Sequence, residues 1–298
     1  MQKSVLLTIQ KFCRLALRMP IIDRIAWPLV KRVRLHFGKT DSFGLFETTF
    51  DGTTRIWVSL CDHIESQIFW QGVQEGDRGE VNLLKSILEP EQVFFDVGAN
   101  IGVFTLIAAR RVKDGRVHAF EPSEFHLKKL HRNVKVNGFQ NVVINPVGLS
   151  NSAAQRKLYF PKLKESMTNT GQSSFYVSED EIKEYVVENV TAVRLDDYVE
   201  DNSLERLDVI KVDVEGAEME VLEGGLTALS KFRPGVMMEV SKSNLACAGK
   251  DLREIVDFWD TLDYALFIIR PNGELTPING LSSFKVHQNI YCCPQEVA

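Results

Sequence analysis

Short, mostly apolar runs alternate with helical segments along the chain from residue 92 onward. Residues 93–97 have the composition of a strand that is buried on both faces of a sheet, and residues 236–240 are another predicted strand. The helical segments carry terminal signals, such as Ser123 at the start of a helix that ends at Asn137-Gly138. This alternation is typical of a parallel sheet covered by helices. We therefore predict an α/β fold with a doubly wound, mostly parallel sheet.

The C-terminal end of this sheet departs from the parallel pattern. The last two predicted strands, residues 264–270 and 285–293, flank Pro271-Asn272-Gly273. Proline, asparagine and glycine in succession are a strong turn signal. We therefore predict a hairpin-like return, with an antiparallel strand at the C-terminal end.

The first 90 residues lie outside the alternating pattern. Two short strand patterns surround Asp51-Gly52, a strong hairpin signal, and a helical stretch stops at Glu89-Pro90. We predict a main α/β domain preceded by a helical and β-hairpin extension. The expected parts are a basic amphipathic segment over residues 1–40, a hairpin and helix elaboration over 41–90, and the α/β domain over 91–298 with an insertion at 155–192.

The charge of the chain is concentrated at its N-terminus. The sequence contains 35 Lys and Arg against 40 Asp and Glu, but residues 1–40 hold nine of these basic residues and one acid, Asp23. A helical projection separates a polar arc from an apolar one. The polar arc holds Lys3, Gln10, Lys11, Arg14 and Arg18, and the apolar arc holds Val5, Ile9, Phe12, Cys13, Ala16 and Met19. Residues 1–35 either lie on an anionic membrane surface or pack on their own domain with a solvated basic face.

Composition excludes several other classes of protein. Hydrophobic residues make up 44% and charged residues 25% of the chain, as in ordinary globular domains. Five scattered cysteines without a C-x-x-C spacing predict reduced thiols, and no His/Cys spacing suggests zinc. The first 20 residues lack a cleavage site, and no apolar run reaches the ~18 residues that span a bilayer. We expect a cytoplasmic protein, with the membrane periphery left open, and no nucleic-acid partner because the net charge is -5.

A glycine-containing loop joins the first predicted strand of the sheet to its helix. It reads Asp96-Val97-Gly98-Ala99-Asn100-Ile101-Gly102. Ligands of open α/β sheets bind beyond the carboxyl ends of the strands, where Gly98 and Gly102 permit a sharp turn and a close approach. Asn100 replaces the central glycine of the dinucleotide fingerprint. An acid and an amide suit an ammonium or sulfonium group, which indicates S-adenosylmethionine.

A second polar group follows the next predicted strand. Glu121 comes one strand–helix unit after Asp96. In nucleotide-binding sheets, an acid roughly 20 residues beyond the loop binds the ribose hydroxyls. Loop and acid together therefore predict a nucleoside-containing cofactor.

Three segments resemble the FkbM family of class I methyltransferases: VFFDVGANIGVFTLIAA, HAFEPSEFHLKKLHRNVKVNG and LDVIKVDVEGAEMEVLEGG. The resemblance runs from about residue 91 to about 240. It implies a Rossmann-like seven-stranded sheet, S-adenosylmethionine as methyl donor, and O-methylation of a hydroxyl on a sugar, glycolipid or natural product. Carried onto this chain, it implies that the methionine end is held by Asp96, Gly98, Asn100 and Gly102, the ribose by Glu121, and the adenine by Asn145 and Val147.

The block D-x-E-G-x-E ends the fourth predicted strand, with Asp213, Glu215 and Glu218. An alcohol must lose its proton as its oxygen attacks a methyl group, and a positioned carboxylate accelerates such a step by about 10²–10⁴-fold. Asp213 is the candidate base, Glu215 supports it or binds the acceptor, and Glu239 at the end of the fifth strand is a second candidate. A competing interpretation is that Asp213, Glu215 and Glu239 hold a divalent cation. A role of Glu215 and Glu218 in forming the helix start is compatible with either interpretation.

The remaining signals concern the acceptor and the class of function. The insertion at 155–192 carries aromatic and hydroxyl side chains that suit a sugar or a ring, or it is a surface excursion. His287 is expected to serve packing rather than the acceptor. The leading hypothesis is an O-methyltransferase, and the alternative is a non-catalytic cofactor-binding or membrane-recruited module with the same fold. A nucleic-acid methyltransferase would need a basic groove beside the active site.

Overall fold

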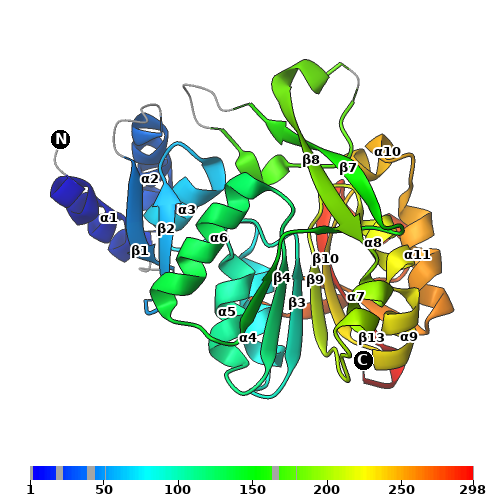
Figure 1. Cartoon of the computed structure of the whole chain (residues 1–298). Coiled ribbons are helices and arrows are strands. Elements are labelled where there is room, and N and C mark those ends of the chain that lie inside the picture. Colours follow the sequence, from blue (N-terminus) through cyan, green and yellow to red (C-terminus); the bar gives the residue numbers. More distant parts are fainter. Residues whose placement is uncertain are drawn as a thin grey trace. The chain divides into compact units, whose positions relative to one another are not determined.

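The computed structural model divides the chain into two compact units (Figure 1). It describes residues 3–17, 23–38, 44–50, 52–162, 168–178 and 180–297. The smaller unit comprises Met1–Arg78 with Pro161–Gln172, and the larger comprises Gly79–Phe160 with Ser173–Ala298. Arg18 and Met19 of the predicted amphipathic helix, and Asp51 of the predicted hairpin turn, lie outside the described residues.

A hairpin and three helices make up most of the described part of the smaller unit. In chain order these are α1 (Lys3–Leu17), α2 (Asp23–Phe37), β1 (Leu45–Thr49), β2 (Arg55–Ser59) and α3 (His63–Gln71). The antiparallel pairing of β1 with β2 confirms the predicted hairpin. The rings of Phe46 and Phe69 lie 5.1 Å apart in its core, and Trp70 packs edge-on against Phe69.

Helix α1 packs on this unit through polar residues that the sequence assigned to solvent or lipid. Gln10 is 5% exposed and its Nε2 donates to the carbonyl oxygen of Phe69 at 2.7 Å. Nε of Arg14 donates to the same oxygen at 3.0 Å. The predicted separation into an outward basic arc and an inward apolar arc is therefore wrong for these two residues. The physical reason is that the last carbonyls of α3 have no partners within their own helix and need donors from outside.

One large sheet organises the larger unit. In the described residues, its strand order is β12-β11-β13-β10-β9-β3-β4-β5. Neighbours from β10 to β5 are parallel, whereas β13 runs antiparallel to both β10 and β11. This confirms a mostly parallel sheet with an antiparallel C-terminal strand. The strands are β3 (Val93–Val97), β4 (Arg116–Phe120), β5 (Val142–Asn145), β9 (Val209–Val212), β10 (Gly235–Ser241), β11 (Tyr264–Ile269), β12 (Leu275–Pro277) and β13 (His287–Pro294).

Helices cover both faces of this sheet, as a doubly wound fold requires (Figure 1). One face carries α4 (Arg78–Ile87), α5 (Val103–Arg111) and α6 (Glu124–Asn137). The other face carries α7 (Leu195–Asp201), α8 (Glu218–Gly224), α9 (Leu226–Phe232) and α11 (Leu252–Thr261), and α10 (Lys242–Cys247) follows β10 directly.

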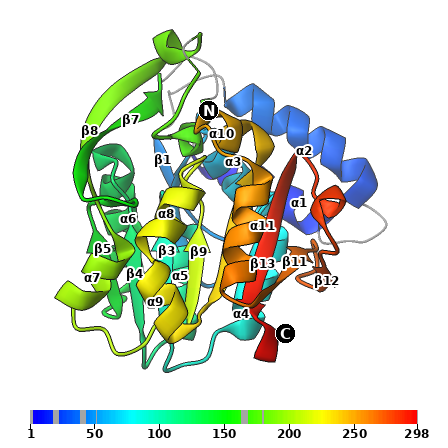
Figure 2. The ribbon, with the colours of Figure 1, turned by 90° about the vertical axis from the view of Figure 1, so that its right-hand side faces the viewer.

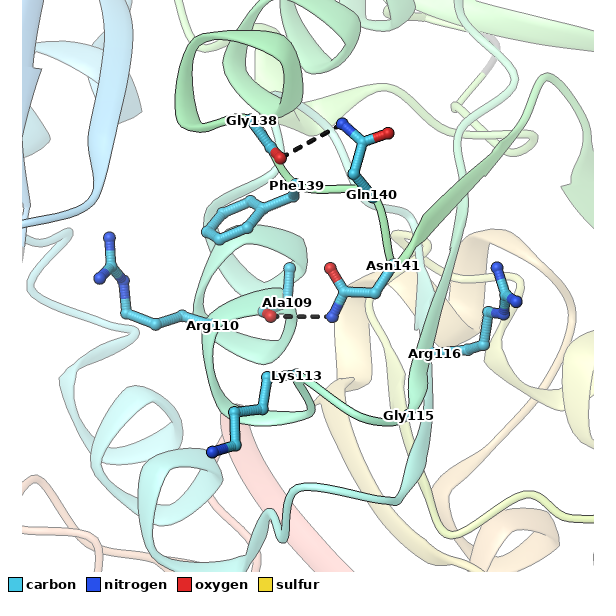
Figure 3. Close-up of a pocket in the computed structure, with 9 residues that line it drawn as sticks. All are labelled: Ala109, Arg110, Lys113, Gly115, Arg116, Gly138, Phe139, Gln140 and Asn141. Atoms are coloured by element: carbon cyan, nitrogen blue, oxygen red, sulfur yellow. Dashed lines mark hydrogen bonds between the residues drawn. The ribbon is translucent and has the colours of Figure 1, made fainter.

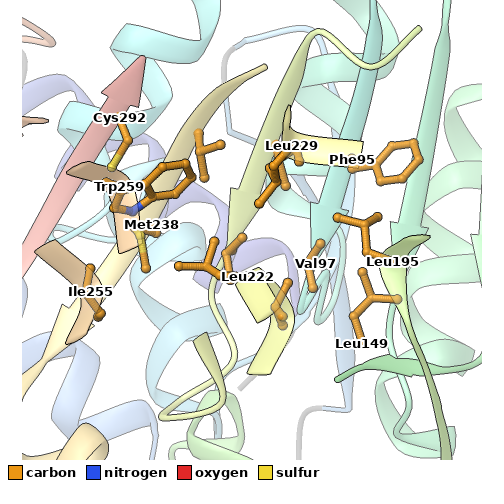
Figure 4. Packing of buried hydrophobic residues seen from close by; sticks show 14 of the residues in the cluster. Phe95, Val97, Leu149, Leu195, Leu222, Leu229, Met238, Ile255, Trp259 and Cys292 are labelled. Atoms are coloured by element: carbon orange, nitrogen blue, oxygen red, sulfur yellow. The ribbon is translucent and has the colours of Figure 1, made fainter. Parts of the chain in front are cut away.

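The main hydrophobic core lies between the sheet and the second of these helix layers. Phe95 and Val97 of β3 point into it beside Leu222 and Leu229 from the helices, and Trp259 packs in the same core near Cys292 and Met238 (Figure 4). Because side chains alternate along a strand, the residue between Phe95 and Val97 must point to the opposite face of the sheet. That residue is Asp96, and its burial on the face of α4 and α5 decides the electrostatics described below.

Two details of the sheet differ from the expected pattern. Within the described residues the large sheet has eight strands rather than seven, because the Pro271-Asn272-Gly273 turn leads into the short edge strand β12 before the chain reaches β13. The helix expected after the acidic block is divided into α8 and α9 at Gly225. Gly224-Gly225 has a low intrinsic helix propensity, and a Cβ on Gly225 would lie 2.5 Å from a methyl carbon of Leu195.

The boundary between the units falls at Arg78/Gly79, earlier than the expected end of the elaboration at residue 90. Helix α4 belongs to the larger unit because Glu80 is buried there and accepts a hydrogen bond from Asn289 at 2.5 Å. The expected insertion contains β7 (Ala154–Pro161) and β8 (Tyr185–Val193), which form a second sheet with β6 (Gly148–Leu149). None of the helices in the described ranges has the length and apolar character needed to cross a bilayer.

Candidate functional site

The loop after β3 adopts a conformation that depends on its glycines. Gly98 has φ 82°, and a Cβ there would lie 1.9 Å from the carbonyl oxygen of Asp213. Gly102 has φ 96°, and a Cβ there would lie 2.5 Å from a methyl carbon of Leu130. Asn100 also takes a left-handed conformation, with φ 50°. The predicted cofactor loop therefore packs directly against the turn that carries the predicted catalytic acid.

Glu121 connects the loops that follow β3 and β4. Its Oε2 accepts a hydrogen bond from the amide of Asn100 at 2.8 Å, and its Oε1 accepts one from the amide of Ser123 at 2.8 Å. The side chain is 5% exposed. The structure thus brings Glu121 together with the loop, as predicted, and also gives it a role in fixing the loop conformation. Each carboxylate oxygen has a second lone pair that can accept from a ribose hydroxyl.

Asn145 is the last residue of β5, Val147 lies two residues beyond it, and both are engaged within the fold. The side-chain Oδ1 of Asn145 accepts from the Tyr198 hydroxyl at 3.1 Å, and its Nδ2 donates to the carbonyl of Ala119 at 3.3 Å. Val147 is partly buried against the main core. The backbone amide of Glu121 donates to the Asn145 carbonyl at 3.1 Å. The segment that starts at Asn145 therefore lies next to the loop that carries Glu121. Their contact with adenine stays a prediction.

A donor such as S-adenosylmethionine fits the polar groups of this loop. The side-chain Oδ1 of Asn100 is buried and has no hydrogen-bond partner among the described residues. A buried acceptor without a partner is unfavourable, so it is suited to a ligand that brings an N–H donor. The Asp96 carboxylate below the loop accepts from the Thr105 hydroxyl at 2.5 Å, and its burial raises its pKa to about 6.

Three carboxylates meet where β9 ends, two of them just beyond β9 and the third near the end of the neighbouring strand β10. Asp213, Glu215 and Glu239 each offer an oxygen, and these oxygens lie within 4.8 Å of one another. The sequence therefore identified residues that the fold brings together. The Asp213 side chain is 32% exposed, so an acceptor can reach it. At this spacing the three oxygens can share either a proton or a cation.

The backbone and neighbours of Glu215 hold it in this cluster. Glu215 has φ 52° and Gly216 φ 110°, and a Cβ on Gly216 would lie 2.8 Å from the carbonyl of Asn244. The Asn244 amide donates to Oε2 of Glu215 at 2.6 Å. Burial, together with the charges of Asp213 and Glu239, raises the pKa of Glu215 to about 9. At neutral pH this group therefore carries a proton.

Glu218 has a separate, structural role. Its Oε1 accepts from the amide of Gly216 at 3.0 Å, and the residue is 3% exposed. Burial raises its pKa to about 7, although the amide hydrogen bond opposes that shift. The interpretation of Glu218 as a helix-start residue therefore agrees with its contacts.

Lys211 is a member of the site that sequence reasoning missed. Its Nζ lies 2.7 Å from Oδ2 of Asp213 and 4.3 Å from the centre of the Phe104 ring, and the residue is 2% exposed. Burial alone would raise the pKa of Asp213, but the Lys211 ammonium outweighs it and the net shift is downward. The sequence did contain an indication of this role, because Lys211 is the one charged residue in β9, where the other residues are apolar and buried.

His287 lies beside the cluster rather than in the core. Its Nδ1 is 2.9 Å from Oε1 of Glu239, and its side chain is 60% exposed. The expectation of a packing role is therefore wrong. The reason is the strand pairing: His287 is the first residue of β13 and pairs with Ser241, the last residue of β10. His287 therefore lies at the end of the sheet rather than in its buried centre.

A separate groove of about 460 Å³ lies away from all these residues (Figure 3). Its lining includes the cations Arg110, Lys113 and Arg116 and the ring of Phe139. These residues precede or begin β4 and precede β5, so the groove is at the amino ends of strands whose carboxyl ends carry the predicted cofactor residues. None of the predicted site residues lines it.

Known methyltransferases resemble this chain in sequence. Residues 96–266 match the family model described as the methyltransferase FkbM domain, which is more than half of the chain. The chain is 34% identical over 151 residues to methyltransferase sdnD of Sordaria araneosa, covering 43% of this chain and 58% of that protein. It is 29% identical over 157 residues to the 31-O-demethyl-FK506 methyltransferase FkbM of Streptomyces tacrolimicus, covering 46% and 60%.

A third relative is the hexuronic acid methyltransferase AglP of Haloferax volcanii, 30% identical over 155 residues, with 52% of this chain and 58% of that protein covered. A solved FkbM methyltransferase of Methylobacillus flagellatus has 17% identity and a TM-score of 0.44 over 69% of this chain and 44% of that one. The chain thus spans less than two thirds of the length of these relatives. With the family model matched over the cofactor loop, the acidic block and the strands between them, the chain belongs to the FkbM methyltransferase family.

Proposed function

We propose that this protein transfers a methyl group from S-adenosylmethionine to a hydroxyl of a sugar, glycolipid or similar small acceptor. One observation carries the proposal: the loop after β3 packs on the turn after β9, at Gly98 and Asp213. A donor held by the loop therefore has its reactive end beside the carboxylates. Two relatives support the acceptor class, since their names specify a 31-O-demethyl compound and hexuronic acid.

Different residues around the loop would bind different parts of the donor. Asn100 would accept from the ammonium group of the methionine end, because its buried Oδ1 has no partner among the described residues. Gly98 and Gly102 would give the loop the left-handed turns that shape it, Asp96 would add negative charge below the loop, and Glu121 would accept from the ribose. Bound S-adenosylmethionine supplies an electrophilic methyl carbon on a positively charged sulfur.

The acidic cluster would receive the proton of the acceptor. Asp213 stays ionised because Lys211 lies beside it, so it can orient the acceptor hydroxyl and accept its hydrogen bond. Burial and the charge of Asp213 raise the pKa of Glu239. Glu239 is therefore the second candidate to take up the proton that the acceptor hydroxyl releases. Alignment of the two substrates contributes the larger part of such a displacement.

The insertion would supply acceptor specificity. Tyr185, at the start of β8, lies within electrostatic range of the Glu215 carboxylate, and Ser174 donates to the Glu215 carbonyl at 2.6 Å. Aromatic and hydroxyl side chains therefore stand next to the cluster, as a sugar or ring acceptor would need. We expect exchange of the insertion to change the acceptor and leave donor binding intact.

Equilibrium binding tests the donor half of this proposal. We expect titration calorimetry to detect S-adenosylmethionine binding to the whole chain. Glu121→Ala should weaken that binding, whereas Glu124→Ala removes a fully exposed acid nearby and should leave it unchanged. Absence of binding to the unaltered protein, or equal binding by both variants, would count against the assigned site.

Transfer of a labelled methyl group to a panel of hexuronic acids, neutral sugars and glycolipids tests the catalytic half. We expect Asp213→Asn to abolish transfer and retain donor binding, and Asp257→Asn, an exposed change of the same kind, to retain both. The alternative is a non-catalytic binding module of the same fold, for which no acceptor would be methylated. A cation held by the three carboxylates is the competing mechanism, and loss of transfer in excess EDTA would favour it.

The proposal also places the protein at the periphery of an anionic membrane, where a lipid-linked acceptor would be found. The excess of basic residues within residues 1–35 supports this location. A membrane location would favour a lipid-linked acceptor over a freely diffusing sugar, because a diffusing sugar would need no membrane attachment of the enzyme.

A further inference from the structure

The two N-terminal helices direct large apolar side chains toward solvent. In α1, Val5, Phe12 and Leu15 are 44%, 69% and 59% exposed. In α2, Leu29 and Leu35 are 63% and 42% exposed. Single exposed apolar residues are ordinary, but a group of them on adjoining helices marks an interaction surface.

The hydrogen bonds of α1 determine this orientation. Gln10 and Arg14 face inward to reach the carbonyls at the end of α3, and Leu6 is fully buried beside them. Phe12 and Leu15 lie on the other side of the helix, three residues apart, where they form one outward stripe. The apolar side chains are therefore exposed because the polar ones are needed inside.

Helix α2 has the same arrangement. Ala26 and Val30 are buried, and Arg34 donates to the carbonyl of His63 at 3.2 Å, so this face also points toward α3. Leu29 and Leu35 lie on the opposite face. Since α1 and α2 pack against each other and against α3, their outward faces are directed away from the same helix (Figure 2).

The charges between these apolar side chains are positive. Lys11 on α1, and Lys31 and Arg32 on α2, are exposed. Within the sequences of the two helices, Asp23 is the single acidic residue, and it stands at the start of α2. We define the outer helical face as Val5, Lys11, Phe12, Leu15, Leu29, Lys31, Arg32 and Leu35. It combines exposed apolar groups with cations and, over these eight positions, contains no acid.

We infer that the outer helical face docks on an anionic lipid bilayer, with its apolar side chains in the headgroup boundary and its lysines and arginine on lipid phosphates. This chemistry is that of interfacial helices, in which buried apolar area and attraction to anionic lipid add together. The outer helical face belongs to helices that are packed on the folded smaller unit. Docking therefore attaches the folded unit to the membrane and does not require α1 to unfold. It does not depend on the proposed methyl transfer.

Vesicle co-sedimentation of the whole chain tests this inference. We expect binding to phosphatidylcholine vesicles that contain phosphatidylserine, and little binding to phosphatidylcholine alone. Phe12→Glu with Leu15→Glu should weaken binding by roughly tenfold or more, because both apolar area and charge complementarity are lost. Lys31→Gln and Arg32→Gln should each weaken it by about fivefold.

Matched changes elsewhere provide the controls. Leu226→Glu replaces an apolar residue that is 46% exposed in α9, and Lys135→Gln removes an exposed cation from α6. Both should leave vesicle binding unchanged, and circular dichroism should give the same melting curve for all variants. Equal vesicle binding by Phe12→Glu/Leu15→Glu and the unaltered chain would overturn the inference. So would a dimer in sedimentation analysis that the same two substitutions dissociate, since the face would then bind a second copy.

The vesicle assay contains neither methyl donor nor acceptor. Its failure would therefore leave the proposed methyl transfer untouched, and failure of methyl transfer would leave the docking surface untouched.

Discussion

The ammonium of Lys211 lies 2.7 Å from the carboxylate of Asp213, and across the parallel pairing of β3 with β9 the same lysine is opposite Asp96. One buried cation therefore stands between the Asp96 carboxyl beneath the loop after β3 and the Asp213 carboxyl, which we propose to face the acceptor. Glu80 of α4 adds a third negative charge near it. These carboxyl groups outweigh the effect of burial and raise the pKa of Lys211, so it stays charged.

Substitution of Lys211 should change how stability depends on pH. The pKa of Asp213 is lowered in the folded protein, so the pair stabilises the fold above the ordinary pKa of an aspartate and loses this effect as the pH falls. In Lys211→Met the pKa of Asp213 should rise, because burial is then unopposed. We expect a loss of about 3–5 kcal/mol at neutral pH and a smaller loss in acid.

Urea denaturation of Lys211→Met at several pH values measures this. The double variant Lys211→Met/Asp213→Asn should recover part of the stability, because it leaves no buried unpaired charge. A loss that is independent of pH and of Asp213 would show that Lys211 contributes packing alone.

Glu215→Gln should stabilise the protein as the pH rises. The pKa of Glu215 is raised to about 9, so between the ordinary glutamate pKa of 4.5 and that value the folded state must hold a proton that the unfolded state releases. Stability of the unaltered protein therefore falls with pH over this range, by at most about 1.4 kcal/mol per pH unit from this group. Glutamine has no such proton to lose.

Thermal unfolding from pH 5 to 8 compares the two proteins. The gap in stability should widen with pH for Glu215→Gln and stay constant for Glu205→Gln, an exposed glutamate on the same unit. A constant gap for Glu215→Gln would mean that its carboxyl is ionised in the folded protein.

Gly98→Ala should disrupt the contact between cofactor loop and acidic turn. The new Cβ would lie 1.9 Å from the Asp213 carbonyl oxygen at a φ of 82°, so either the loop or the turn must move. We expect a loss of roughly 3 kcal/mol or more and no detectable binding of S-adenosylmethionine. Gly138→Ala is the control: its φ is 71° with nothing within 4 Å, and it should cost about 1 kcal/mol and retain binding.

The sequence predicted those parts of the site that depend on local order. Strand β3 was placed at its observed bounds, and Gly98 and Asp213 were both assigned to strand ends, because apolar runs and glycines carry that information locally. The meeting of Asp213, Glu215 and Glu239 followed from the rule that parallel strands end at one edge.

The parts that could not be predicted depend on contacts between distant segments. The partners of Lys211 come from α4, β3 and the turn after β9, and no spacing within one segment specifies them. The inward orientation of Gln10 and Arg14 has the same origin. A helical projection ranks residues by polarity, but the unpaired carbonyls at the end of α3 decided which face of α1 packs inward.

Ser174→Ala should lower turnover and leave donor binding unchanged. The Ser174 hydroxyl donates to the carbonyl of Glu215 at 2.6 Å and accepts from the amide of Tyr176 at 2.9 Å, so it fixes the acidic turn to the insertion. Glu215 sits at a positive φ, which persists only while its surroundings hold it.

Without this hydrogen bond we expect a stability loss of about 1 kcal/mol. The larger effect should fall on the alignment of the carboxylates, with kcat reduced by about tenfold or more and the dissociation constant of S-adenosylmethionine unchanged. Ser174→Thr keeps the hydroxyl and should restore part of kcat. Ser178→Ala, a nearby change on the same segment, should alter neither quantity. If Ser174→Ala lowered donor affinity and kcat together, the serine would act on the whole site through folding rather than on the position of Glu215.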